Sequence, residues 1–274
     1  MQSASISGEG LKIFGRLASQ KIDLQILNLS NNDLGNASAY HLKHFIGTIV
    51  SLNLSCTKLG TKGCLELTKN LKIAVKSGVN KLQYLDLSQN NIGTEGFMKL
   101  AKRLRQSDSL LNLNVSGNQM ASGDFTNFEK FLSGCKSLVT LNISHCGLPR
   151  QAFMFLGDGI SKNSTLQKLI MTDNDLSDPV MLKFICDGII TSKVEPKLLE
   201  LDFQRCGINE KSVVPLAKLL QCKYKLRVLN LRDNAITDDG ASVLLQALQM
   251  NPYLTKLNLE LNPLRHNSVV EIEA

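Results

Sequence analysis

Apolar residues recur along the chain in a fixed arrangement that predicts alternating strands and helices. Nine segments follow the pattern L-x-x-L-x-L-x-x-N-x-L, in which aliphatic residues alternate with mostly polar ones. Alternation of this kind is typical of a strand with one buried face. Between the segments lie stretches such as TEGFMKLAKRLRQS and TDDGASVLLQALQM, whose apolar residues recur at spacings of three and four, as in an amphipathic helix. The chain is therefore predicted to repeat one strand-helix unit.

The spacing of the nine segments is close to constant. Five of the eight intervals are 28 residues, and the other three are 25, 33 and 32 residues. One unit cannot bury its leucines alone, whereas stacked units share a continuous core and a ladder of backbone hydrogen bonds. The segments begin at Leu24, Ile49, Leu82, Leu110, Leu138, Leu166, Leu198, Leu226 and Leu254.

Copies such as LQYLDLSQNNI and LLNLNVSGNQM, with the 28-residue period and a helix in each repeat, resemble leucine-rich repeat proteins of the ribonuclease-inhibitor-like subclass. The resemblance implies an α/β solenoid, a horseshoe with a parallel sheet on its concave side and helices on its convex side. We predict a single leucine-rich repeat domain over residues 1–274, made of a partial repeat, 1–23, and nine repeats from 24 to 274.

The ninth pattern position is predicted to hold the bend that leaves each strand. A buried amide there can bond to backbone groups of the turn, and the hydroxyl or thiol of Thr57, Cys146 and Cys206 can make similar or weaker bonds. The asparagines at this position are Asn32, Asn90, Asn118, Asn174, Asn234 and Asn262.

Both ends of the chain fall inside repeats. The segment ISGEGLKIFGRLASQKIDL aligns with IGTEGFMKLAKRLRQSDSL, and NPLRHNSVVEIEA stops within the helix expected for the ninth copy. Terminal repeats usually need a polar cap. We therefore expect a piece of a longer chain, or a partner that covers the ends, with a chain that has degenerate caps as the alternative.

Two longer intervals contain insertions, around KIAVKSGVNK and TSKVEPK. Both are expected after a helix and before the next strand, on one edge of the solenoid. Insertions at one edge often mark a binding rim. Drift in a tolerant surface loop is the alternative.

The concave face changes character along the chain. Pattern positions three, five and seven are expected to point to this face. Through repeat five they are short and polar, with Tyr84 as the one large side chain expected there, whereas from repeat six they are long, charged or, at Ile170, apolar. Long groups on a rigid sheet suit partner binding, although cross-strand neutralisation is the alternative. The predicted partner-binding residues are Lys168, Glu200, Asp202, Gln204, Arg205, Arg227, Arg232, Asp233, Lys256 and Glu260.

Charge is uneven between the two halves. Residues 1–137 carry 16 Lys and Arg against 9 Asp and Glu, while residues 138–274 carry 15 of each sign. The excess lies in helix and loop segments, where it can attract an acidic protein, nucleic acid or anionic lipid. A solvated lysine-rich face without a ligand is the alternative.

Motifs for chemistry are missing from the sequence. The seven cysteines form no C-x-x-C pair and no metal-like spacing with the four histidines, and no phosphate-binding or dinucleotide-binding glycine motif occurs. We expect no catalytic residues, no metal and no cofactor. No run of apolar residues reaches the length of a membrane span, and four N-x-S sequons fall inside expected strands. These features favour the cytoplasm.

Two function classes remain open. The resemblance implies most often a non-catalytic protein-protein interaction scaffold or regulator, with its partner on the concave face. The alternative is a GTPase-activating protein, because the nuclear-transport GTPase activator resembles the same subclass. That family carries an acidic segment after its repeats, which this sequence lacks.

Overall fold

The computed structural model describes residues 6–18 and 23–265. The chain divides into two compact units, Met1–Asn142 and Ile143–Ala274. Each pattern segment forms a strand of three residues. The first unit contains α1 (Gly8–Ala18), β1 (Ile26–Asn28), η1 (Asn36–His44), β2 (Ser51–Asn53), α2 (Gly60–Lys76), β3 (Tyr84–Asp86), α3 (Gly93–Leu104), β4 (Asn112–Asn114), α4 (Thr126–Gly134) and β5 (Thr140–Asn142).

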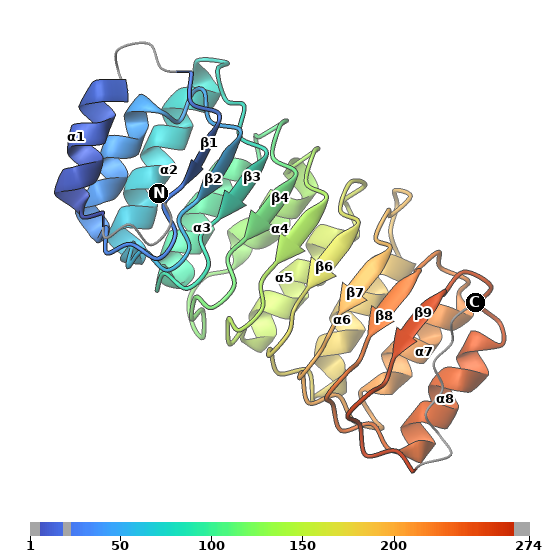
Figure 1. Cartoon of the computed structure of the whole chain (residues 1–274). Helices are drawn as coiled ribbons and strands as arrows, with labels where there is room; N and C mark the ends of the chain where they lie inside the picture. Colours follow the sequence, from blue (N-terminus) through green and yellow to red (C-terminus); the bar gives the residue numbers. More distant parts are fainter. Residues whose placement is uncertain (1–5, 19–22, 266–274) are drawn as a thin grey trace. The chain divides into compact units, whose positions relative to one another are not determined.

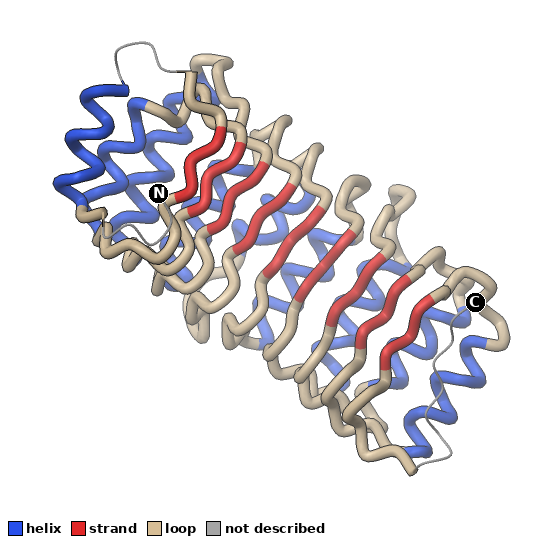
Figure 2. Tube along the Cα trace, viewed as in Figure 1, coloured by secondary structure: helices blue, strands red, loops and turns tan. Residues whose placement is uncertain are grey.

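The strands of the first unit pair in sequence order, and every pair is parallel. Each strand aligns its central leucine with that of its neighbour, as Leu27 does with Leu52 and Leu85 with Leu113. The helices lie together on one face of this sheet and leave the other face open (Figure 1, Figure 2). The repeat pattern therefore determines the register of the strands and the face of the sheet that the helices cover.

The second unit is built in the same way. Its four strands pair in parallel in sequence order, with Leu169, Leu201, Leu229 and Leu257 in line. Its elements are α5 (Arg150–Ile160), β6 (Lys168–Ile170), α6 (Pro179–Ile190), β7 (Glu200–Asp202), α7 (Val213–Gln221), β8 (Val228–Asn230), α8 (Asp238–Leu248) and β9 (Lys256–Asn258).

The core of each unit lies between its sheet and its helices. Pattern positions one, four and six fill it from the strand side, as the buried Leu82, Leu85 and Leu87 show. Apolar residues at helical spacing fill it from the other side, and in the first unit Phe97 and Phe128 meet edge to face across α3 and α4, with ring centroids 5.4 Å apart. The helix-facing side of the sheet and the sheet-facing side of the helices are therefore both buried, and this shared core makes the repeats stack.

The ninth-position asparagines bond to the backbone as predicted. Asn90, which is 1% exposed, donates from Nδ2 to the carbonyls of Leu54 (2.6 Å) and Leu87 (3.1 Å), and its Oδ1 accepts from the amides of Thr57 and Leu59 (3.0 Å each). The amide thus ties two successive repeats together. The replacements behave as expected, since the Thr57 hydroxyl donates to Leu54 O (2.8 Å) and the thiols of Cys146 and Cys206 approach carbonyl oxygens at 3.3–3.4 Å.

The intervals that differ from 28 residues are accommodated by changes in helix type and length more than the sequence indicated. The 25-residue interval contains η1, a 3-10 helix, whose rise of about 2.0 Å per residue spans the layer with fewer residues than the α-helix's rise of about 1.5 Å. The placement of the first insertion entirely after the helix is wrong, because α2 continues through KIAVK to Lys76. The second insertion does follow its helix, since α6 ends at Ile190.

The predicted fold class, an α/β leucine-rich repeat solenoid, is confirmed by this arrangement. The extent of a single domain over the whole chain stays a prediction. The helix expected for the ninth copy lies in residues 266–274, outside the described residues.

Candidate protein-binding surface

The open sheet face of the second unit carries three rows of side chains across β6 to β9. The strand register places the third pattern residues opposite one another, and likewise the fifth. Strand alternation places the seventh pattern residues on the same face. The rows are Lys168, Glu200, Val228 and Lys256, then Ile170, Asp202, Asn230 and Asn258, then Thr172, Gln204, Arg232 and Glu260. They include seven of the ten predicted contact residues.

Two ion pairs link neighbouring strands within these rows. Lys168 Nζ lies 2.8 Å from Glu200 Oε2, and the guanidinium of Arg232 contacts the carboxylate of Glu260. All four side chains keep 36–45% of their surface exposed. Exposed pairs of this kind contribute only about 0–1 kcal/mol to stability. Cross-strand neutralisation therefore occurs, but it leaves these groups within reach of solvent.

Asp202 has a structural part in this face. Its Oδ1 accepts hydrogen bonds from the backbone amide of Gln204 and from Nδ2 of Asn230, each at 3.1 Å. The same link from position seven to position five recurs at Asn230 with Arg232, at 3.1 Å, and at Asn258 with Glu260, at 2.9 Å. The repeated Asn or Asp at position five thus shapes the end of each strand. Among the described residues, Oδ2 of Asp202 has no hydrogen-bond donor.

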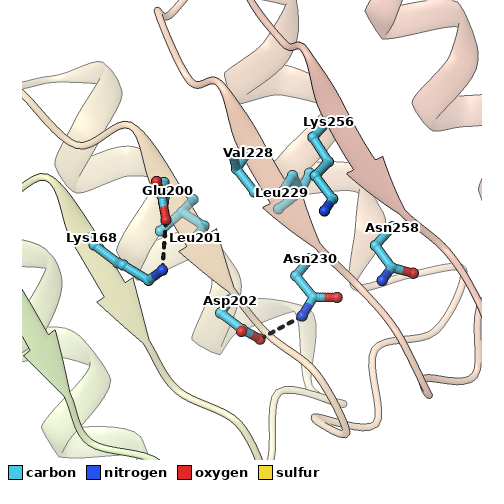
Figure 3. Close-up of a pocket in the computed structure, with 9 residues that line it drawn as sticks. All are labelled: Lys168, Glu200, Leu201, Asp202, Val228, Leu229, Asn230, Lys256 and Asn258. Carbon is cyan, nitrogen blue, oxygen red and sulfur yellow. Dashed lines mark hydrogen bonds and ion pairs between the residues drawn. The ribbon is translucent and has the colours of Figure 1, made fainter. Parts of the chain in front are cut away.

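A hollow of about 130 Å³ opens between the first two rows (Figure 3). It forms where the short Val228 stands between the longer Glu200 and Lys256. On the β9 side of the hollow, Lys256 Nζ and Asn258 Nδ2 have no acceptor among the described residues. The hollow is lined by Lys168, Glu200, Leu201, Asp202, Val228, Leu229, Asn230, Lys256 and Asn258.

The other three predicted residues lie outside the rows. Arg205 and Asp233 occupy the eighth pattern position, where both adopt left-handed backbone with φ of 53° and 55°. Arg205 Nη2 there contacts Asp173 Oδ2 at 2.8 Å, and His145 Nδ1 contacts the same oxygen at 2.9 Å. Arg227 is exposed at the second position, and its carbonyl accepts ladder bonds.

The cluster of His145, Asp173 and Arg205 was not expected from the sequence. The sequence signal for this cluster is the eighth pattern position. It has positive φ in every described repeat, so its residues share one backbone conformation at the bend that leaves each strand. That position holds Asn31, Cys56, Gln89, Gly117, His145, Asp173, Arg205, Asp233 and Leu261. Only in the second unit does it alternate in charge.

The first unit's sheet face differs, although not entirely as expected. Its positions five and seven are small and polar in every repeat. The expectation that Tyr84 is its one large side chain is wrong, because Ile26 at position three is 71% exposed. The contrast in charge between the two units nevertheless holds.

Metal-ligating side chains and thiols are two kinds of reactive group that the described residues could offer. Within residues 6–18 and 23–265, no group of His, Cys, Asp and Glu is placed to hold a metal ion. Burial raises the pKa of the Cys64 and Cys206 thiols to about 12, which keeps them protonated and poorly nucleophilic. Among the described helices, none has the length and apolar character to cross a membrane.

Comparison with known proteins agrees with the repeat pattern. A family model described as Leucine Rich repeat matches residues 20–42, 80–101, 162–179 and 225–245. NACHT, LRR and PYD domains-containing protein 5 of Mus musculus is 25% identical over 91% of this chain and 24% of its own length. Ribonuclease inhibitor of Mus musculus is 30% identical over 42% of this chain and 24% of its own length.

The solved crystal structure of a TLR13–ssRNA13 complex has a TM-score of 0.53 and 20% sequence identity, over 92% of this chain and 35% of that one. This likeness supports the fold alone. Together with the repeat geometry, the matches identify a leucine-rich repeat protein. Its repeats are of the ribonuclease-inhibitor-like type. The chain spans about a quarter of the length of these two curated relatives.

Proposed function

We propose that the chain is a non-catalytic protein-binding scaffold or regulator, and that its partner contacts the open sheet face of repeats six to nine. The observation that carries this proposal is the hollow in that face. Lys256 Nζ, Asn258 Nδ2 and Asp202 Oδ2 offer two donors and one acceptor around it without partners among the described residues, over a floor that includes Val228.

The sheet gives this face an advantage for binding. Its side chains stand on a hydrogen-bonded ladder, so the backbone is already ordered before a partner arrives, and less entropy is lost on binding. The part-exposed ion pairs of Lys168 and Arg232 can exchange their carboxylates for those of a partner at small cost. Ribonuclease inhibitor is, by its name, a regulator of another protein, which is the type of interaction proposed here.

Replacing Arg232 with serine tests the proposed surface. Because the Arg232–Glu260 pair is part-exposed, its loss should lower the free energy of unfolding by no more than about 1 kcal/mol. Binding should weaken by about 1 kcal/mol or more if the arginine anchors the partner. Partners captured from source-cell extract with the wild-type chain are first purified. Their affinity for wild type and Arg232→Ser is then measured by calorimetry.

Lys218→Ser is a charge-matched control, since it removes one exposed cation from α7, on the helical side of the same unit. It should bind as wild type does. Equal affinity of Arg232→Ser and wild type, together with a several-degree fall in melting temperature, would assign Arg232 to a structural charge ladder instead.

A GTP hydrolysis assay with a panel of small GTPases distinguishes the proposed scaffold from the alternative, a GTPase-activating protein. A scaffold leaves each GTPase at its intrinsic rate, while an activator accelerates at least one of them. A cytoplasmic location remains a prediction, which microscopy of the tagged chain in its own cells can check.

A further inference from the structure

Helix α2 extends past its neighbour at one end. Both α2 and α3 begin eleven residues after the start of their repeats, at Gly60 and Gly93. Helix α2 has 17 residues and α3 has 12, so the difference falls entirely at the C-terminal end of α2. Five residues of α-helix add about 7.5 Å. We call Lys72–Lys81, which comprises this extension and the turn after it, the α2 tip.

The tip is a closed, ordered turn. Gly78 has φ of 67°, and its amide donates to Val75 O at 3.2 Å. The amide of Val79 then reaches back to Ala74 O at 3.1 Å, which completes a Schellman arrangement. Val79 is thereby held under the last helical turn, where its side chain lies against Gly47 of the preceding repeat.

Two aliphatic side chains of the tip face solvent. Ile73 is 63% exposed and Val79 is 46% exposed. By contrast, Leu67, Leu71 and Ala74 on the opposite side of the same helix are buried. The amphipathic pattern of α2 therefore accounts for the buried residues but leaves Ile73 unexplained as a core position.

Lysines lie close in sequence to these exposed aliphatic groups. Lys72, Lys76 and Lys81 are exposed, and within the described residues none of them forms an ion pair. The single acid on α2, Glu66, lies 2.7 Å from Lys69. The tip thus combines three positive charges that form no ion pair among the described residues with two exposed aliphatic side chains, on an extension of α2 that ends in a hydrogen-bonded turn.

We propose that the α2 tip docks on the surface of an anionic lipid bilayer. Lysine ammonium groups are attracted to acidic headgroups, and exposed aliphatic side chains can enter the headgroup boundary. Nucleic acid is the less suitable ligand, because the tip contains neither an arginine fork nor an aromatic ring on which a base can stack. A fluid bilayer surface can also accommodate the α2 tip without a preformed complementary pocket.

Vesicle sedimentation tests the charge component. Wild-type chain should bind vesicles of phosphatidylcholine with about one third phosphatidylserine, and not vesicles of phosphatidylcholine alone. The Lys72→Gln/Lys76→Gln variant should lose about fivefold in affinity for each lysine removed. Lys99→Gln/Lys102→Gln on α3 is the matched control, because it removes two exposed lysines that lie outside Lys72–Lys81. This variant should lose clearly less affinity.

A fluorescent variant tests insertion directly. The chain has no tryptophan, so Ile73→Trp places a single reporter in the chain. Ile73 is exposed, so the larger ring does not have to fit into the core. Its emission should shift to the blue with phosphatidylserine vesicles and not with neutral ones. Val243→Trp, at a part-exposed site on α8, should show no shift.

Three results would overturn the proposal. They are no binding of wild type to anionic vesicles, equal losses in the tip and control lysine variants, or an unshifted Ile73→Trp spectrum in the presence of bound vesicles. Tight binding of single-stranded RNA that the tip variant alone loses, without vesicle binding, would assign the tip to nucleic acid instead.

Discussion

At the residue scale, a buried amide and an exposed charged side chain differ in how strongly their surroundings determine their partners. The ninth-position asparagines could be assigned from the sequence because a buried amide at a strand-leaving bend must bond to the backbone. The candidate contact residues were harder to assign. Lys168 and Arg232 each find a carboxylate one strand away, whereas Lys256 finds none among the described residues. The sequence places all three in rows, but it does not specify the rotamers that decide which charges pair.

Asn90→Ala tests the importance of the amide ladder. The change leaves the Thr57 and Leu59 amides and the Leu54 carbonyl without their side-chain partner in a buried site. Each unsatisfied buried group costs about 1–3 kcal/mol, so the free energy of unfolding should fall by about 3 kcal/mol or more. Urea unfolding measures it. The same change at the part-exposed Asn262 should cost less, because water can replace the lost bonds. Equal losses at both positions would contradict this account.

At the element scale, the period indicated each strand and helix, but not how irregular intervals are accommodated. Five extra residues could have lengthened a loop or a helix. Here Leu67, Leu71 and Ala74 continue the buried face of α2 until Gly78 can close it, and this signal was present in the sequence. The packing distance between α5 and α6 was not predictable in that way, because it depends on two glycines that meet across the interface.

Gly188→Ala tests that close approach. A Cβ on Gly188 would overlap Gly157 O, which is backbone and cannot rotate away. The helices must separate, and overpacking of this kind costs about 1–3 kcal/mol. Gly96→Ala is the matched control in α3, since its Cβ would meet Cys64 at an ordinary 3.4 Å. There the better helix propensity of alanine should stabilise the chain, by up to about 1 kcal/mol. Opposite signs in thermal unfolding are expected, and a stabilised Gly188→Ala would refute the close contact.

At the scale of the whole molecule, net charge and the character of the sheet face both change along the chain. The excess of positive charge lies in residues 1–137, and the charge-balanced sheet face lies in repeats six to nine. The sequence showed this division, because counting charges needs no coordinates. It could not show that the first part also exposes Ile73 and Val79 beside its lysines, since exposure depends on where α2 ends.

The two proposed surfaces should therefore act independently. Lys72→Gln/Lys76→Gln should weaken vesicle binding and leave partner affinity unchanged, while Arg232→Ser should do the reverse, because the altered residues belong to different compact units. Salt should distinguish them as well. Binding through unpaired lysines is screened strongly as ionic strength rises from about 0.05 M to 0.5 M, whereas the sheet face, whose charges balance, should lose less of its affinity. Both interactions are measured on the full chain, by sedimentation and calorimetry, in the same buffers. If one variant weakened both interactions, a single diffuse electrostatic surface would explain the binding better than two separate sites.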